Sequence, residues 1–295
     1  MTKVIIYGHQ IKDAADFEFV ASLLDSATEN GIILYVFRPF LKEINKFSDR
    51  FCDHLTFEYH KELCEIQPDG AITLGGDGTI LKIITLIKNL PIPILGINLG
   101  RLGFLANVEK KFIKKAITQL VKKDYSIFSR SILGISCNLP LFSSFPYALN
   151  DFTLNKRDTS SMITIHTYVD DILLNSYWAD GIIVSTPTGS TGYSLSCGGP
   201  IIFPDSNNFV ITPVAPHNLN VRPIVIPDTK KITLKVEGRS DSFMCTLDSR
   251  YETITSEHRI EITKGAFQIQ FIYLKGQSFM KTLSEKLLWG LDKRN

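Results

Sequence analysis

The alternation of strand-like and helix-like patterns over residues 1–125 constrains the fold more than any other feature of the sequence. Short apolar, β-branched runs predict buried strands at Lys3–Tyr7, Ile32–Phe37, Gly70–Leu74 and Pro93–Gly96. Apolar residues at helical spacing predict helices at Asp13–Asn30, Thr79–Asn89 and Lys110–Lys123. Because strands that alternate with helices need crossover connections, we expect an α/β domain with a mostly parallel sheet over residues 1–125. Residues 38–69 carry no pattern that predicts an element.

The pattern changes after this point, and residues 126–267 predict a second, β-rich domain. Its segments are short and rich in Ile, Thr, Val and Tyr, as in MITIHTYV, DILLNSYW, KKITLKVE, HRIEITK and FQIQFIYL. Turn residues such as Asp170-Asp171 and Glu237-Gly238 separate them. An amphipathic pattern over Ser278–Gly290 predicts a terminal helix.

Composition excludes several classes of function. With 32 Lys and Arg against 30 Asp and Glu, the net charge is only +2, so non-specific binding to nucleic acid is not expected. The five cysteines are far apart and form no C-x-x-C, which argues against a disulfide framework or a zinc site and favours a reducing compartment. No apolar run reaches the ~18 residues that cross a bilayer. We therefore expect a cytoplasmic protein with no membrane partner.

The segment DGAITLGGDGTILKIITLI predicts a phosphate-binding loop. A strand ends at Leu74, the chain turns through Gly75, Gly76, Asp77 and Gly78, and a helix is expected to begin near Thr79. Glycines let the backbone approach a ligand closely, and a helix start offers N–H groups and a positive dipole end to an anion. An Asp among such amides fits phosphoryl transfer, in which it accepts the proton of an attacking hydroxyl or orients a metal. The alternative is a tight turn with Asp77 as an ordinary N-cap.

Two common nucleotide motifs are absent, which narrows the class of enzyme. Neither G-x-x-x-x-G-K-[ST] nor G-x-G-x-x-G occurs, so a Walker-type ATPase and a hydride-transferring Rossmann enzyme are disfavoured. Lys82 lies one turn into the predicted helix, where it could reach a phosphate or simply be solvated.

The run WADGIIVSTPTGSTGYSLSCGGPII, from residue 178 onward, combines many glycines with many hydroxyl side chains. Such a backbone suits close contact with sugar hydroxyls or phosphates, and Tyr193 could stack on a base; a Ser/Thr-rich surface loop is the alternative. No G-x-S-x-G elbow accompanies these serines, so nucleophilic hydrolysis is not expected. Asn150-Asp151 could bind vicinal ribose hydroxyls or make an Asx turn.

Several of these blocks together resemble the NAD kinase family. They are GGDGT at 75–79, GINLGRLGFLA at 96–106, LND at 149–151, DGIIVSTPTGSTGYSLSCGGPI at 180–201 and PHNLNVRPIVIP at 216–227. The resemblance implies an N-terminal α/β domain, a β-rich C-terminal domain, and a C-terminal helix, residues 268–295, that joins the first domain. It also implies transfer of the γ-phosphate of ATP to the 2′-hydroxyl of the adenosine ribose of NAD, giving NADP. A divalent cation, usually Mg, would accompany the nucleotide, and the protein would form homodimers or homotetramers.

The resemblance also implies roles for individual residues. Asp77 would be the proton acceptor, with Gly75, Gly76, Gly78 and Thr79 forming the phosphate loop and Lys82 a basic group near the phosphates. Asp77, Gly78 and Lys82 would also contact the dinucleotide. The other dinucleotide contacts would be Asn150, Asp151, Asp180, Thr191, Gly192, Tyr193, Ser194, Leu195 and Ser196. No protein side chain is expected to ligate the metal directly.

Four positions depart from the family pattern. Asp151 stands where many members have Glu, and Gly192 replaces a common Ala, which would loosen the pocket wall. Arg250 occupies the Gln position of a D-S-Q motif and cannot accept a hydrogen bond, although it could favour a phosphate. Trp178 stands where some relatives carry a basic residue.

Two other functions remain as alternatives. A lipid or sugar kinase could share the glycine loop, and a non-catalytic sensor could bind NAD(P) without turnover.

Overall fold

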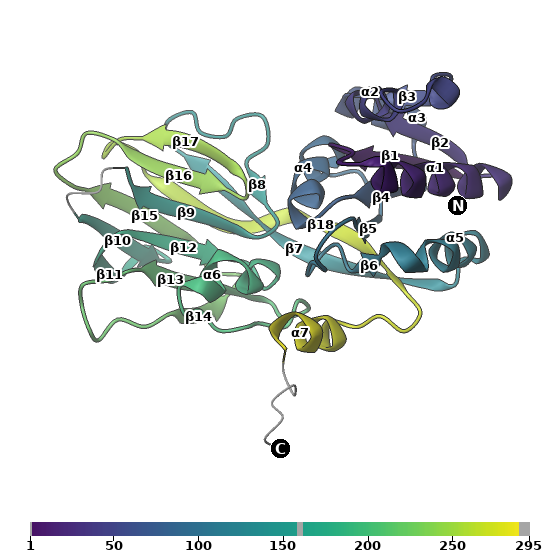
Figure 1. The fold of residues 1–295 in the computed structure, drawn as a ribbon. Coiled ribbons are helices and arrows are strands. Elements are labelled where there is room, and N and C mark those ends of the chain that lie inside the picture. Colours follow the sequence, from purple (N-terminus) through teal and green to yellow (C-terminus); the bar gives the residue numbers. More distant parts are fainter. Residues whose placement is uncertain (1, 158–161, 289–295) are drawn as a thin grey trace, which may run out of the picture. The chain divides into compact units, whose positions relative to one another are not determined.

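The structure, a computed structural model, describes residues 2–157 and 162–288, which form two compact units (Figure 1). The first unit contains the described residues up to Phe128 and those from Ile269 onward, and the second contains Ser129–Gln268. Two long strands, β7 (Tyr125–Cys137) and β18 (Ile260–Leu274), have residues in both units.

The first unit is built on a parallel sheet with the strand order β18–β5–β4–β1–β2–β3, and β6 also pairs with β5. Its strands are β1 (Lys3–Gly8), β2 (Ile33–Phe37), β3 (Leu55–Phe57), β4 (Gly70–Leu74), β5 (Ile94–Asn98), β6 (Val108–Glu109) and the end of β18. Every residue of β4 and of β5 is buried. A parallel strand that is covered on both faces needs such a continuous apolar run. For this reason the sequence of β4 and β5 predicts buried strands clearly.

Helices cover both faces of this sheet. They are α1 (Ala14–Glu29), α2 (Arg38–Asn45), α3 (His60–Ile66), α4 (Asp77–Ile87) and α5 (Ile113–Lys122); a further helix, α7 (Phe279–Leu287), follows β18. Helix α1 contacts α5, and α3 contacts α4. Val4 and Ile6 pack in one core cluster with the apolar residues of α1 and α5, while Ile5, which alternates to the opposite face, is equally buried.

The predicted helices are confirmed with adjusted ends. The side chain of Asp13 caps α1 by accepting a hydrogen bond from the backbone N–H of Asp16 at 2.8 Å. Gly31, just after the helix, has the left-handed φ of +74°. The predicted start of the next helix near Thr79 is wrong by two residues, because Gly76 serves as the N-cap and α4 begins at Asp77.

Residues 38–69, where no element was predicted, contain α2, a 3-10 turn (Asp49–Phe51), β3 and α3. Helix α2 follows β2 without a loop, and β3 has only three residues. With 8, 3 and 7 residues, α2, β3 and α3 are each shorter than the window of about 11–18 residues over which a hydrophobic period is recognised, so hydrophobic spacing does not reveal them.

The second unit has two antiparallel sheets around a shared core. One has the order β11–β10–β15–β18, and the other β14–β13–β12–β9–β16–β17. Their strands are β9 (Asp151–Lys156), β10 (Ile163–Val169), β11 (Ile172–Ala179), β12 (Gly181–Ser185), β13 (Asn208–Val214), β14 (Ile224–Pro227), β15 (Ile232–Glu237), β16 (Phe243–Leu247) and β17 (Arg250–Ile254). The short strand β8 (Tyr147–Ala148) pairs with β7. Ile165 and Leu234 of the first sheet belong to one cluster with Phe152 and Val184 of the second.

The prediction of a C-terminal helix over 268–295 is wrong for its first part, since the described residues 268–288 are only partly helical. The residues up to Leu274 continue β18, because Phe271 pairs with Ile94 in the parallel sheet. Helix α7 begins after Ser278, whose hydroxyl accepts a hydrogen bond from the N–H of Lys281 at 3.2 Å. The predicted end at Gly290 lies outside the described residues.

Within residues 2–157 and 162–288, no helix combines the length and the apolar composition needed to span a membrane.

Candidate active site

The glycine loop joins β4 to α4 with an open backbone surface. Gly75 has a φ of +152°, and a Cβ there would lie 2.2 Å from Oγ1 of Thr79, so both conformation and space require glycine. A Cβ on Gly76 or Gly78 would meet no heavy atom within 4 Å. The first turn of α4 therefore lies beside free space, where its N–H groups and dipole can receive an anion.

Asp77 does not cap its own helix, so the alternative interpretation as an N-cap is wrong. Its Oδ1 accepts hydrogen bonds from the backbone N–H groups of Leu105 at 3.0 Å and Ala106 at 2.9 Å, and its Oδ2 accepts one from Phe104 at 2.9 Å. A carboxylate offers about four lone-pair sites, and three are used in this arrangement. The carboxylate is thus fixed by backbone groups and retains on Oδ2 the capacity for one further donor.

The loop that holds Asp77 is itself held by Asn98, which lies at the end of β5 and is only 4% exposed. Its side-chain oxygen accepts the N–H of Gly100 at 2.6 Å, and its amide nitrogen donates to the carbonyl of Arg101. A Cβ on Gly103 would lie 2.0 Å from Oδ1 of Asp77. The sequence analysis identified the block GINLGRLGFLA but gave Asn98 and Gly103 no individual role. The pattern that could have revealed them is a glycine-rich turn directly after a buried strand.

His9 is a further residue at this edge that sequence reasoning missed. Gly8, the last residue of β1, pairs with Leu74, so His9 and the glycine loop leave the sheet at the same carboxyl edge. Burial and the nearby charge of Lys82 both lower the pKa of His9, which keeps its imidazole neutral at pH 7. Lys82 is exposed, and its charge acts on His9.

In the second unit, two predicted site segments lie against each other. The carbonyl of Asn150 accepts the N–H of Thr186 at 2.8 Å, and the hydroxyl of Thr186 donates to the carbonyl of Leu149 at 2.6 Å. A Cβ on Gly189 would lie 2.2 Å from the carbonyl oxygen of Asn150. The tertiary fold therefore joins LND at 149–151 to the block at 180–201.

Asp151 and Asp248 form a pair of neighbouring carboxyl groups, of which Asp151 is a buried residue and Asp248 a partly buried one. Asp151 is only 7% exposed, and burial together with the nearby charge of Asp248 raises its pKa to about 7. Burial also raises the pKa of Asp248, against the lowering effect of its backbone hydrogen bonds. The position where a Cβ would stand on Gly192 is 4.0 Å from Oδ2 of Asp151, so this carboxyl group lies beside the 191–196 segment.

The 191–196 segment follows a 3-10 turn (Thr188–Thr191) and forms the short helix α6 (Tyr193–Ser196). Tyr193 is 43% exposed, and its pKa is raised by burial first and then by neighbouring groups that include Asp151. The hydroxyl of Ser194, by contrast, is buried and bonded to that of Thr212 at 2.8 Å. Tyr193 can therefore present its ring to a ligand, whereas the hydroxyl of Ser194 is used within the fold.

Many of the other hydroxyl groups in this block also have internal partners. Ser190 donates to the carbonyl of Pro187 at 2.6 Å and accepts the N–H of Ile202 at 2.9 Å, and Thr191 donates to the carbonyl of Thr188 at 3.2 Å. Leu195 is partly buried and Ser196 is exposed. The density of Ser and Thr thus reflects in large part a compact loop that satisfies its own backbone.

The side chain of Arg250, for which a phosphate contact was considered, has partners within its own unit. Its two terminal nitrogens donate to the carbonyl oxygens of Phe145 and Tyr147, and its guanidinium carbon lies 5.2 Å from the centre of the Phe145 ring. A guanidinium committed to two carbonyls and to an aromatic face fixes the chain before β8, and the expectation that it favours a phosphate is not supported.

Asp180 and Trp178 have partners within their own unit. Asp180 forms an ion pair with Lys156 at 2.6 Å, and both side chains are partly exposed. The ring of Trp178 lies 5.0 Å from that of His217, and Trp178 is 46% exposed. An exposed indole can stack on a flat group but cannot replace the charge of a basic residue.

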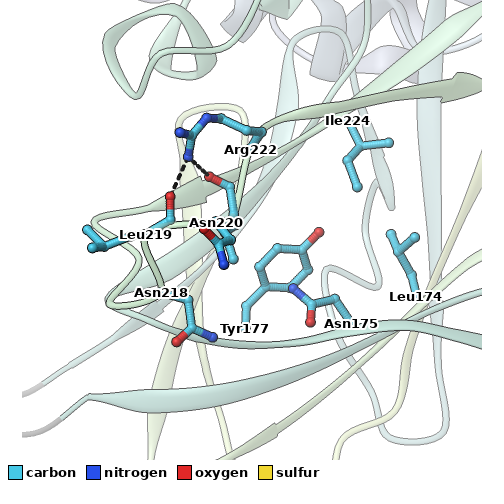
Figure 2. Close-up of a pocket in the computed structure, with 9 residues that line it drawn as sticks. Leu174, Asn175, Tyr177, Asn218, Leu219, Asn220, Arg222 and Ile224 are labelled. Carbon is cyan, nitrogen blue, oxygen red and sulfur yellow. Dashed lines mark hydrogen bonds between the residues drawn. The ribbon is translucent and has the colours of Figure 1, made fainter.

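A separate pocket of about 600 Å³ opens in the second unit between β11 and the 218–224 segment (Figure 2). Its lining consists of amide, aliphatic, phenol and guanidinium side chains: Leu174, Asn175, Tyr177, Asn218, Leu219, Asn220, Val221, Arg222 and Ile224. One terminal nitrogen of Arg222 donates to the carbonyls of Leu219 at 2.6 Å and Val221 at 2.8 Å, as the dashed lines in Figure 2 show. None of the predicted site residues lines this pocket.

The described residues contain no group of three or more His, Cys, Asp or Glu side chains placed to hold a metal ion.

Comparison with known proteins gives matches along most of the chain. The model of the ATP-NAD kinase N-terminal domain matches residues 20–125, and that of the ATP-NAD kinase C-terminal domain matches residues 149–274. The NAD kinase of Christiangramia forsetii is 46% identical over 297 residues, which cover 99% of this chain and 100% of that protein. The NAD kinase of Cytophaga hutchinsonii is 49% identical over 78% of each chain.

Two solved structures share the fold. A yeast NADH kinase complexed with NADH superposes with a TM-score of 0.87 at 21% identity, covering 98% of this chain and 88% of that one. An NAD kinase from Archaeoglobus fulgidus in complex with ATP gives a TM-score of 0.73 at 25% identity, covering 98% and 99%. These likenesses confirm the predicted fold of an α/β domain followed by a β-rich domain. With both family models matched and nearly the whole chain aligned to a relative at 46% identity, this chain belongs to the NAD kinase family.

Proposed function

We propose that this protein is an NAD kinase that transfers the γ-phosphate of ATP to the 2′-hydroxyl of the adenosine ribose of NAD, giving NADP. Family membership over both domains supports the reaction. One observation carries the assignment of the chemistry. The carboxylate of Asp77, on the first turn of α4, is fixed by three backbone N–H groups, and the glycines beside it leave open space.

In this mechanism Asp77 accepts the proton of the 2′-hydroxyl. The Oδ2 atom has one protein donor against two on Oδ1, so Oδ2 receives the hydrogen bond of the ribose hydroxyl. Because an alcohol is far less acidic than a carboxylic acid, the proton moves late, as the bond between oxygen and phosphorus forms. A base that is already oriented avoids the cost of ordering it at the moment of reaction.

The phosphate groups of ATP would lie against the loop Gly75–Thr79, whose glycines let the backbone N–H groups approach them. Lys82, one turn further along α4, would add a positive charge. Magnesium fits this arrangement as an ion that is carried mainly by the phosphates, since Mg²⁺ keeps several waters and needs only one or two protein carboxylates. When bound, it would neutralise phosphate charge.

Dinucleotide contacts would come from Asn150, Asp151 and Asp180, together with the 191–196 segment. Tyr193 would offer its exposed ring for stacking, and Gly192 would leave room for close backbone approach. Ser194 would contribute through its backbone and through the packing of α6, since its hydroxyl is bonded to Thr212.

The test is NADP formation from NAD, ATP and Mg²⁺ by the wild type and by Asp77→Asn. We expect the variant to lose roughly 10²–10⁴-fold in kcat, the size of general-base assistance. Asp13→Asn is the matched control, because Asp13 also stands at a helix start and Asn is an equally good N-cap. Wild-type turnover in Asp77→Asn would refute the assignment of Asp77.

Offering NAD, a diacylglycerol and a sugar phosphate in parallel separates this function from the two alternatives. A lipid or sugar kinase that shared only the glycine loop gives no reason for the match over residues 149–274. NAD binding without turnover would favour the sensor. Assembly as a homodimer or homotetramer, a cytoplasmic location and the absence of nucleic-acid and membrane partners stay predictions.

A further inference from the structure

Asp248 binds three consecutive backbone N–H groups with a single carboxylate. It lies in the turn between β16 and β17 and has a left-handed φ of +54°. Its Oδ2 accepts the N–H of Leu149 at 2.9 Å, and its Oδ1 accepts those of Asn150 at 2.8 Å and Asp151 at 3.3 Å. Its own N–H donates to the carbonyl of Asp151 at 3.0 Å. Converging backbone amides of this kind form an anion-binding nest, and here the anion is a side chain of the same protein.

The opposite side of the same three residues is held by the 185–189 segment. Thr186 bonds to the carbonyls of Leu149 and Asn150, and Gly189 packs so closely on Asn150 that no side chain fits there. Leu149–Asp151 is therefore held by Asp248 on one side, through its three N–H groups and the carbonyl of Asp151, and by Thr186 on the other, through the carbonyls of Leu149 and Asn150. With the backbone held on both sides, the Cα–Cβ directions of Asn150 and Asp151, from which their side chains extend, are fixed as well.

We propose that Asp248 is the positioning residue of the dinucleotide site, which holds Leu149–Asp151 so that Asn150 and Asp151 present their side chains to NAD. The proposal rests on the proposed function. It assigns Asp248 no contact with substrate; Asp248 acts through the backbone that it binds.

A second consequence follows from the closeness of the two carboxyl groups. Two neighbouring carboxyl groups, one of them buried, do not both ionise readily, so the proton state of Asp151 depends on Asp248. The other ionisable groups around the pair are Tyr193 of α6, which faces Asp151, and Arg250 of β17, whose charge acts on Asp248. Removing the charge of Asp248 therefore lets Asp151 ionise at a lower pH.

The experiment compares wild type, Asp248→Asn and Asp241→Asn in NADP formation between pH 6 and 8.5. Asp241 is an exposed residue of the loop before β16 and serves as the control. In Asp248→Asn an amide group would face N–H donors, so we expect the KM for NAD to rise by at least about 10-fold, the equivalent of one charge-assisted hydrogen bond. The KM for ATP should be unchanged and kcat should change less than about 3-fold, since the groups that bind phosphate are untouched.

The pH dependence separates positioning from a general loss of structure. In the wild type the KM for NAD should change with an apparent pKa near 7, the value of Asp151. In Asp248→Asn this change should move to a lower pH, which a merely destabilised fold would not produce. An unchanged KM and an unchanged pH profile in a folded Asp248→Asn would overturn the proposal. Failure of the wild type to form NADP would instead overturn the proposed function.

A measurement on the wild type keeps the proposal testable if the variant does not fold. The amide protons of Leu149, Asn150 and Asp151 should be protected from exchange, and their NMR shifts should titrate near pH 7 with the acid pair. Rapid exchange, or shifts that do not change between pH 6 and 8, would contradict the role of Asp248.

Discussion

Gly103 and Asp77 are in contact only because position 103 has no side chain: a Cβ there would lie 2.0 Å from Oδ1 of the carboxylate. The loop that carries Gly103 supplies the three N–H groups that fix this carboxylate. The position of the proposed proton acceptor is thus determined by a glycine 26 residues further along the chain.

Gly103→Ala should impair catalysis without unfolding the protein. The new methyl group would displace the Asp77 carboxylate, and a displacement of about 1 Å can cost on the order of 10²-fold in rate. Gly100→Ala is the control from the same loop, because its Cβ would be 3.9 Å from the nearest atom. Steady-state kinetics with both variants checks this, and equal kcat values for the two would contradict it.

Gly189→Ala should weaken both stability and NAD binding. Its Cβ would lie 2.2 Å from the carbonyl oxygen of Asn150, and a backbone atom cannot rotate away. We expect a loss of roughly 1–3 kcal/mol in the free energy of unfolding, as for an overpacked core. Gly192→Ala should cost less, because its nearest neighbour is 3.2 Å away. Urea denaturation compares the two, and a Gly192→Ala variant that is the less stable would refute this ranking.

The stability of the protein should fall as pH rises toward neutrality. Asp151 has a pKa of about 7 in the folded protein and about 3.9 when unfolded, so between these pH values the folded state binds more protons. The contribution is complete below about pH 4 and is lost as pH rises through about 7. Asp151→Asn should remove this decline, since an amide does not titrate.

Urea midpoints at pH 5 and pH 8 measure this effect. The difference between the two should shrink in Asp151→Asn and persist in Asp205→Asn, which changes an exposed aspartate of the same unit. An equal pH dependence in wild type and Asp151→Asn would show that the pair is not responsible.

Arg250→Gln should loosen the chain around Phe145–Tyr147 more than it affects ATP binding. Two hydrogen bonds from a charged donor to carbonyl oxygens are lost, and the glutamine amide that replaces the guanidinium is shorter and uncharged. We expect a loss of about 2 kcal/mol in stability and faster amide exchange over residues 142–148. A higher KM for ATP with unchanged exchange would instead restore the phosphate role that the sequence suggested.

Much of the first unit could be predicted from the sequence, because strands such as β4 and helices such as α1 carry complete periods and clear end signals. Residues 38–69 could not, since their elements are too short. In the site, the glycine loop and Asp77 were identified, whereas Asn98, Gly103 and Asp248 were not singled out as site residues. Nothing local distinguishes an Asn or Asp that binds a distant backbone from one that is solvated.

The amino-acid sequence by itself determined where the chain turns and which residues can be buried, because glycine conformation and hydrophobic period are local properties. It also placed the chain in its family through the glycine loop and the 180–201 block. Only the tertiary structure decided what each polar side chain binds. Asp77 meets N–H groups 27 to 29 residues away, and Asp248 meets those of residues 97 to 99 positions earlier. The physical reason is that a hydrogen bond depends on distance in space, and the fold alone brings such separated segments within hydrogen-bonding distance of each other.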